Sequence, residues 1–177
     1  MVEVVPYDPR WPTAFVAEAL RLRTALGSLA LRIDHHGSTA IPGLAAKPII
    51  DIQVSVAALQ PIAAYGERLQ ALGYVHVPHP DDSFCPFFHR PPQWPHSHHV
   101  HVVEGGGAEE RRTLAFRDYL RDNSAAAHEY DRLKQDLVMQ VTAVDRESRE
   151  AYARAKTDFI ERTVAMALSS GYPREQA

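Results

Sequence analysis

The character of the sequence changes near residue 108, and this change limits the folds that the chain can adopt. Before it, short segments rich in Val, Ile and Phe alternate with two amphipathic helical patterns and with turns rich in Gly and Pro. After it, the apolar spacing predicts three helices, over residues 108–122, 125–143 and 146–168. We therefore predict an α+β fold, in which a mixed β-sheet with flanking helices is joined by a C-terminal helical bundle.

The chain has 177 residues and no long polar linker, which indicates one domain over residues 1–177 with a mixed part over 1–107 and a helical part over 108–170. Two helices are predicted in the mixed part. The apolar face of the first is formed by Trp11, Phe15, Ala19, Leu22 and Leu26, and the second covers residues 61–72. The predicted strands cover residues 29–36, 48–56, 74–77, 85–89 and 99–104.

Composition excludes several classes of protein. Lys and Arg number 19 against 22 Asp and Glu, a net charge of −3 that disfavours duplex nucleic acid as a partner. The single cysteine, Cys85, cannot form an internal disulfide bond. The sequence has no apolar run long enough to span a membrane, and its N-terminal segment does not resemble a signal peptide. We expect a cytoplasmic protein without a membrane partner, and composition leaves its oligomeric state open.

The candidate site begins where the predicted strand over residues 29–36 ends. Gly37 and Ser38 follow it, and the exposed N–H groups of such a turn, with a hydroxyl, can hold a phosphate oxygen. The alternative is an ordinary turn. Asp51 then lies among the isoleucines of the next strand, so its carboxylate must be paired, bound to a metal ion or placed at a strand edge.

The run HHGSTAIPGLAAKPIIDIQV, over residues 35–54, resembles the GrpB family, whose members are similar to the nucleotidyltransferase superfamily. The resemblance extends from Val4 to about Ile160. It continues through YDPRWPTAFVAEALRLRTALG, HHVHVVEGG, FRDYLRDN, EYDRLKQDL and AYARAKTDFI, in the family's order. In some bacteria a GrpB module is fused to dephospho-CoA kinase.

This resemblance implies a nucleotidyltransferase-like fold and a phosphorylated ligand, either a nucleotide or a CoA-like small molecule. Gly37 and Ser38 would cradle its phosphates, and Asp51 would bind Mg²⁺ or Mn²⁺ to align a phosphorus atom for attack by a hydroxyl group. Gln53 stands where the superfamily has a second carboxylate. We assign catalytic roles to Asp51, Gln53 and His101, and the alternative is a non-catalytic nucleotide-binding, CoA-binding or accessory module.

Strand alternation places His99 and His101 on one face of the last predicted strand and Glu104 on the other. If the two histidines face Asp51, the three side chains form a metal site that suits Zn²⁺, Mn²⁺ or Fe²⁺ better than Mg²⁺. A metal-dependent hydrolase is therefore a third possibility. The alternative is that the histidines are hydrogen-bonded polar residues. We expect His36, Glu104 and Tyr152 to surround the site, and the loop residues His96 and His98 to be exposed.

A phosphate-rich ligand also needs cations. The candidates are Lys47, close to Asp51 in the sequence, and Arg117, Lys134 and Lys156 in the helical part. The alternative for Arg117 and Lys134 is a solvated helix face beside aspartates. A single-stranded nucleic-acid end remains a possible acceptor.

Overall fold

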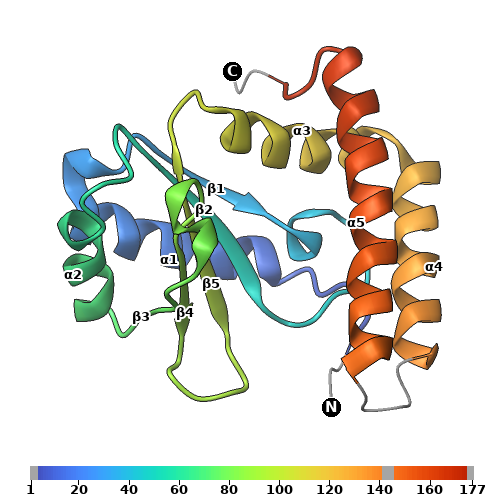
Figure 1. Cartoon of the computed structure of the whole chain (residues 1–177), viewed down its shortest axis with the longest axis horizontal. Helices are drawn as coiled ribbons and strands as arrows, with labels where there is room; N and C mark the ends of the chain where they lie inside the picture. Colours follow the sequence, from blue (N-terminus) through green and yellow to red (C-terminus); the bar gives the residue numbers. More distant parts are fainter. Residues whose placement is uncertain (1–3, 141–145, 175–177) are drawn as a thin grey trace.

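The computed structural model describes residues 4–140 and 146–174, and the side chains of residues 4–136 and 156–174. The described residues form one mixed sheet and five α-helices, which confirms the predicted α+β class (Figure 1). The strands are β1 (Arg32–His36), β2 (Ile50–Val56), β3 (Val75–His76), β4 (Phe87–Arg90) and β5 (His98–Glu104). The helices are α1 (Trp11–Leu26), α2 (Ala63–Ala71), α3 (Ala108–Asp122), α4 (Ser124–Gln140) and α5 (Arg146–Ser169).

The strand order in the sheet is β1-β2-β5-β4-β3. The central strands β2 and β5 are parallel, and the other neighbours are antiparallel. The register aligns Asp51 with His36 of β1 on one side and with His99 of β5 on the other. Because aligned residues project from the same face of a sheet, these three polar side chains form a row across it.

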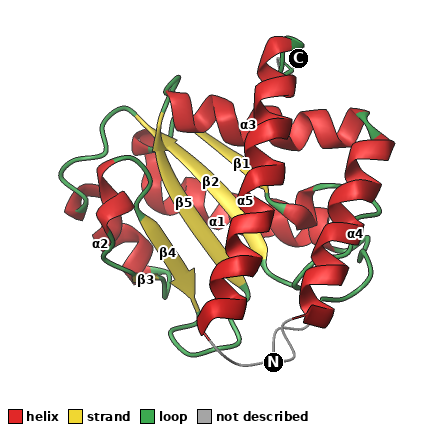
Figure 2. Cartoon of the chain, turned by 45° about the vertical axis from the view of Figure 1, so that its right-hand side comes forward, coloured by secondary structure: helices red, strands yellow, loops and turns green. Residues whose placement is uncertain are grey.

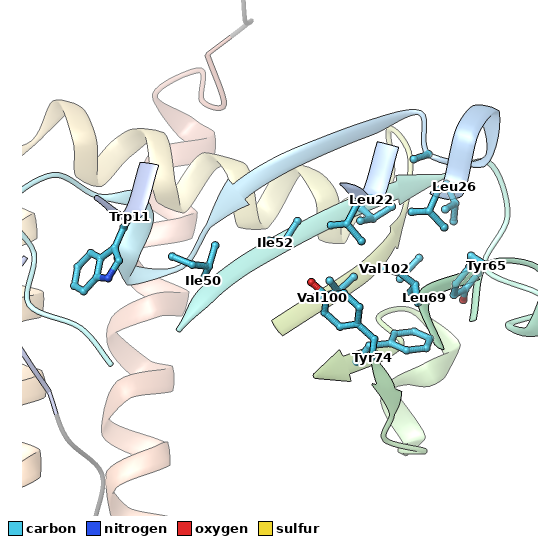
Figure 3. Close-up of a cluster of buried hydrophobic side chains, with 14 of the residues drawn as sticks. Trp11, Leu22, Leu26, Ile50, Ile52, Tyr65, Leu69, Tyr74, Val100 and Val102 are labelled. Atoms are coloured by element: carbon cyan, nitrogen blue, oxygen red, sulfur yellow. The ribbon is translucent and has the colours of Figure 1, made fainter. Parts of the chain in front are cut away.

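One face of the sheet is apolar. Ile52 and Val54 of β2 and Val100 of β5 are each 0% exposed, and they pack against residues of α1 and α2 such as Leu22 and Leu69 (Figure 3). Burial of each such side chain stabilises the fold by about 1.5–3 kcal/mol. This face therefore provides most of the apolar burial that fixes the sheet and its first two helices.

The opposite face of the sheet meets the helical part. Figure 2 shows α1 behind the sheet and α5 in front of it. A second core joins Ile41 and Leu44, which follow the Gly37–Ser38 turn, to Leu120, Tyr130 and Phe159 of the helices. The segment after the turn is thereby held against α3, α4 and α5. No helix in residues 4–140 and 146–174 is both long and apolar enough to cross a membrane.

Candidate metal and phosphate site

A cavity of about 980 Å³ opens on the polar face of the sheet, next to the helical part. Its volume lies at the upper end of the range of about 300–1,000 Å³ that is usual for small-molecule sites. The predicted site residues that line it are His36, Gly37, Ser38, Lys47, Asp51, Gln53, His99, His101, Lys134 and Lys156. The fold therefore brings together polar residues that lie far apart in the sequence.

Asp51, His99 and His101 converge in this cavity, as the strand alternation predicts. Nδ1 of His99 lies 3.2 Å from Oδ1 of Asp51, and Nε2 of His101 lies 3.9 Å from the same oxygen. One ligand atom from each residue lies within 4.8 Å of the other two, so a single ion can reach all three. One carboxylate and two imidazoles are donors that suit Zn²⁺, Mn²⁺ or Fe²⁺.

The electrostatics of the cluster favour the forms that can bind a metal ion. Burial alone would raise the pKa of Asp51, but the hydrogen bond with His99 and the nearby His36 and His101 outweigh it and lower the pKa to about 2. Burial lowers the pKa of His101, which favours its neutral imidazole with a free lone pair. Metal ligands of both types must be deprotonated in this way.

Gly37 brings the backbone of the turn directly against Asp51. Its φ of 68° lies in the left-handed region that favours glycine. A Cβ atom on this residue would lie 2.4 Å from Oδ2 of Asp51, which is inside any acceptable contact distance. The site therefore requires glycine here for two independent reasons, the backbone conformation and the space.

Ser38, the next residue, is held by the helical part. Nζ of Lys134 donates to Oγ of Ser38 at 3.4 Å and also to the carbonyl oxygen of Ala45. Tyr130 forms a side-chain hydrogen bond with Ser38, and its ring lies 5.0 Å from Nζ of Lys134. Burial lowers the pKa of Lys134 to about 8, although the nearby Asp131 acts in the opposite direction. A cation and a hydroxyl thus lie side by side at the turn.

The chain has three lysines, Lys47, Lys134 and Lys156, and all three line this cavity. Burial lowers the pKa of Lys47, and Lys156 lowers it further by charge repulsion, while Asp51 opposes both effects. Lys156 also lowers the pKa of Lys134. The ammonium group of Lys156 therefore repels those of Lys47 and Lys134, and a bound anion would relieve that repulsion.

Two polar groups of the cavity have unused hydrogen-bonding capacity. Gln53 is 0% exposed, and neither atom of its amide has a hydrogen-bond partner in the described part of the chain. Nε2 of His36 also has no partner there, and its ring packs edge-on against His101 with centroids 4.9 Å apart. Burial, followed by the nearby His101, lowers the pKa of His36 to about 3. Unpaired buried polar groups destabilise a fold, so both can gain from a ligand.

The structure does not bring Arg117 into the cavity lining. Its side chain is 3% exposed and pairs with Asp118 at 2.7 Å and with Asp34 at 3.4 Å. It also donates to the carbonyl oxygen of His35 at 3.1 Å. Because α3 directs this guanidinium toward the edge strand β1, its contacts hold the helix to the sheet, and it lies outside the cavity that the other predicted phosphate-binding residues line.

Two predicted site residues remain. One lies away from the cavity, and the side chain of the other lies outside the part of the chain that the structure describes. Glu104 is exposed at the end of β5 and is not part of the cavity lining, because strand alternation turns it to the other face. Tyr152 falls in α5, but its side chain lies outside the described residues.

Sequence reasoning missed three neighbours of the candidate metal cluster. His96, expected to be exposed, is half-buried, and its Nδ1 lies 3.2 Å from Nε2 of His99. Sγ of Cys85 lies 3.8 Å from Nδ1 of His101, and the ring of Phe87 lies 5.0 Å from the rings of both His99 and His101. The antiparallel pairing of β4 with β5 brings Phe87 opposite His101, and no local pattern in the sequence reveals that register.

Comparison with known proteins identifies relatives over most of the chain. The family model described as GrpB protein matches residues 1–165. UPF0157 protein PA4798 of Pseudomonas aeruginosa is 40% identical over 176 residues, which cover 96% of this chain and 69% of the relative. UPF0157 protein BH1888 of Halalkalibacterium halodurans is 37% identical over 162 residues, with coverage of 90% and 79%. A dephospho-CoA kinase of Mycobacterium tuberculosis is 31% identical over 184 residues, but the match covers only 45% of that enzyme.

Solved structures give the same picture of the fold. The crystal structure of GrpB from Enterococcus faecalis matches with a TM-score of 0.75 and 31% identity, and the match covers 90% of this chain and 98% of that chain. The Cid1 poly(U) polymerase matches with a TM-score of 0.52 and 15% identity, over 77% of this chain and 45% of the polymerase. At this identity the second match concerns the fold alone.

Proposed function

The chain belongs to the GrpB family, and from this premise we propose that it binds a nucleotide or a related phosphorylated ligand together with a divalent metal ion. The observation that carries the proposal is the content of one cavity, in which the metal-type cluster of Asp51, His99 and His101 lies with every lysine of the chain. A polyphosphate is the common type of ligand that needs both a divalent ion and several ammonium groups.

Asp51, His99 and His101 would hold the ion. When bound there, a divalent ion supplies positive charge that offsets the phosphate charge and orients the phosphorus atom. The chain itself supplies one carboxylate and two imidazoles in a partly buried setting, and this donor set favours Mn²⁺, Zn²⁺ or Fe²⁺ over Mg²⁺.

The phosphates would lie between this cluster and the Gly37–Ser38 turn. Gly37 keeps the backbone close to Asp51, and Ser38 presents a hydroxyl that Lys134 already contacts. Lys47 and Lys156 add positive charge to the same cavity. Charge-assisted hydrogen bonds of this kind are roughly twice as strong as neutral ones.

Nucleotidyl transfer to an acceptor is the activity that we infer from the family's resemblance to nucleotidyltransferases and from the shared fold. The acceptor's chemical class stays open in this proposal. Gln53 favours a second candidate, a non-catalytic nucleotide-binding or CoA-binding module, because an amide contributes no charge to a second metal ion. The Asp51, His99 and His101 cluster favours a third, a metal-dependent hydrolase, because a single-ion site of this type suits hydrolysis.

Calorimetric titration tests the binding proposal. ATP, CTP, GTP, UTP and CoA are each titrated into the wild type with Mn²⁺, and the same titrations follow for Asp51→Ala and Ser38→Ala. His128→Ala is the matched control, because His128 is an exposed histidine of α4 that does not line the cavity. We expect binding in the wild type and the control and a loss in both site variants. No binding of any of these ligands by the wild type would overturn the proposal.

Turnover separates the three candidates. Pyrophosphate release by the wild type together with a nucleotidylated product supports transfer and excludes the non-catalytic module, whereas release only after Gln53→Asp supports a module that has lost its second carboxylate. Hydrolysis of a nucleotide or phosphoester by metal-loaded wild type, without an acceptor and abolished by His101→Ala, supports the hydrolase.

A further inference from the structure

The ring of His99 has a polar partner at each nitrogen. Its Nδ1 lies 3.2 Å from Oδ1 of Asp51, and its Nε2 lies 3.2 Å from Nδ1 of His96. The two contacts lie on opposite sides of the imidazole and fix both its position and its rotation. Asp51 belongs to β2, but His96 belongs to the loop between β4 and β5, so His99 is held from two separate segments.

His96 is itself held in place. Its ring stacks on the ring of His89 with centroids 3.9 Å apart and planes at 10°. Trp94 packs against it edge-on at 5.1 Å, and Nδ1 of His89 lies 3.1 Å from the carbonyl oxygen of Pro91. A half-buried imidazole between two aromatic neighbours loses little further freedom when it binds a partner.

The contact with His96 is compatible with two tautomers of His99, the one expected without an ion and the one that can bind an ion. Without an ion, the carboxylate of Asp51 can only accept, so Nδ1 of His99 carries the hydrogen and Nε2 accepts from Nδ1–H of His96. To bind an ion, Nδ1 of His99 must offer its lone pair, and the hydrogen then resides on Nε2. Nδ1 of His96 becomes the acceptor, so the same contact persists with its direction reversed.

We propose that His96 is a positioning residue for the metal site, which keeps Nδ1 of His99 directed at Asp51 and at the ion. The proposal rests on the proposed function. The change of tautomer leaves one hydrogen on each imidazole, since a hydrogen lost to water from one nitrogen is regained at the other. Outer partners of this kind set the orientation and basicity of metal-ligating histidines, and their loss weakens metal affinity by about 10–100-fold.

His101 provides an internal comparison. Its outer nitrogen, Nδ1, lies 3.8 Å from the thiol of Cys85, which is a weak hydrogen-bonding group. Burial raises the pKa of Cys85 to about 12, so the thiol stays neutral. The two ligand histidines therefore differ in how firmly they are held, and the stronger outer contact belongs to His99.

Three variants at position 96 separate the roles of the ring. His96→Phe keeps an aromatic ring for stacking but removes both nitrogens, and His96→Ala removes the ring as well. His96→Asn is the rescue variant, because one side of its amide occupies the position of Nδ1 and can accept or donate by rotation. His128→Phe on the exposed face of α4 is the control, and circular dichroism checks that each variant is folded.

The first measurement is the affinity for Co²⁺, which is determined from the visible absorption of the bound ion. We expect His96→Phe and His96→Ala to bind about 10–100-fold more weakly than the wild type, and His96→Asn to recover most of the loss. Unchanged affinity in His96→Phe, with a wild type that binds, overturns the role of His96 and leaves the proposed function intact. No binding by the wild type instead contradicts the metal part of the proposed function.

The second measurement needs no metal ion. Long-range ¹H–¹⁵N spectra of histidine-labelled protein report which nitrogen of His99 carries the hydrogen. We expect the hydrogen on Nδ1 in both metal-free proteins, because Asp51 places it there. In His96→Phe the Nε2 signal should shift and the ring signals should broaden, because Nε2 loses its partner and the ring is held from one side only. Identical His99 signals in the two proteins overturn the proposal, whatever the metal titration gives.

Discussion

The two faces of the central strands β2 and β5 differ sharply in the side chains that they carry. On one face, Ile52, Val54 and Val100 are fully buried against α1 and α2. On the other, Asp51 and His99 line a cavity. Along each strand, one residue packs in the apolar core and the next faces the cavity, because side chains alternate across a sheet.

This difference indicates which face of the sheet contributes less to the stability of the fold. The apolar face has well-packed aliphatic side chains. On the polar face, the amide of Gln53 and Nε2 of His36 have no hydrogen-bond partner among the described residues. Such unsatisfied groups are typical of functional sites, where a ligand rather than the fold supplies the missing contacts.

The largest effect is expected on the apolar face. Ile52→Ala removes a side chain that is 0% exposed and should lower the free energy of unfolding by about 2–5 kcal/mol. Chemical denaturation measures it. The matched control is Gln53→Leu at the next residue, which replaces an amide without a partner in the described part of the chain by an apolar side chain and should change stability by less than about 1 kcal/mol. A larger loss in Gln53→Leu than in Ile52→Ala would refute the division of roles between the faces.

On the polar face, Asp51→Asn should weaken metal binding and also lower stability, by less than Ile52→Ala does. It removes the carboxylate shared by His99 and His101, and the affinity for Mn²⁺ or Zn²⁺ should fall by more than about 100-fold, beyond the loss typical of outer partners. The melting temperature should fall by several degrees, because a carboxylate whose folded pKa lies below its unfolded value contributes stability at neutral pH that an amide does not. Metal titration and thermal unfolding of one preparation give both values, and unfolding at ambient temperature would contradict the prediction.

Gly37→Ala tests the contact between the turn and Asp51. We expect loss of metal affinity by more than about 10-fold, because the new Cβ would lie 2.4 Å from the carboxylate and must displace it, in addition to strain of about 1–2 kcal/mol. Gly43→Ala is the matched control, since Gly43 has a φ of 79° but nothing within 4 Å of the added atom. Equal metal affinities in the two variants would show that strain alone, and not the clash, matters.

The smallest effect concerns pH. The pKa of Lys134, about 8, means that its charge is present below pH 8 and lost above it, so the affinity for a polyphosphate should fall by up to about tenfold between pH 7 and 9. Because the folded pKa lies below the unfolded one, the unfolded chain binds more protons between pH 8 and 10.5, and this lysine makes stability rise with pH in that window. Calorimetry at three pH values with wild type and Lys134→Met checks the first effect. An equal fall in Lys134→Met would assign it to another group.

Local sequence patterns predicted most of the helices and strands correctly. The three helices predicted from residue 108 onward correspond to α3, α4 and α5, with ends within three residues of the predicted ones. Strand boundaries were less accurate. The strand predicted over 29–36 begins only at Arg32, because residues Gly27–Leu29 form a 3₁₀ turn. Apolar periodicity reports which face is buried but not where backbone pairing starts.

The sequence by itself determined which side chains share a face of each central strand. Alternation in β2 and β5 already placed Asp51 with Gln53 and His99 with His101, since side-chain direction in a strand depends only on neighbouring residues. Tertiary structure decided which of these groups meet. Asp51 and His99 are 48 positions apart, and Ser38 and Lys134 are 96 apart, so their contacts depend on the parallel register and on helix packing. The same packing turned Arg117 toward Asp34 and brought His96 to His99. Local propensity carries no information about such distances, because they result from burying apolar faces across the whole chain.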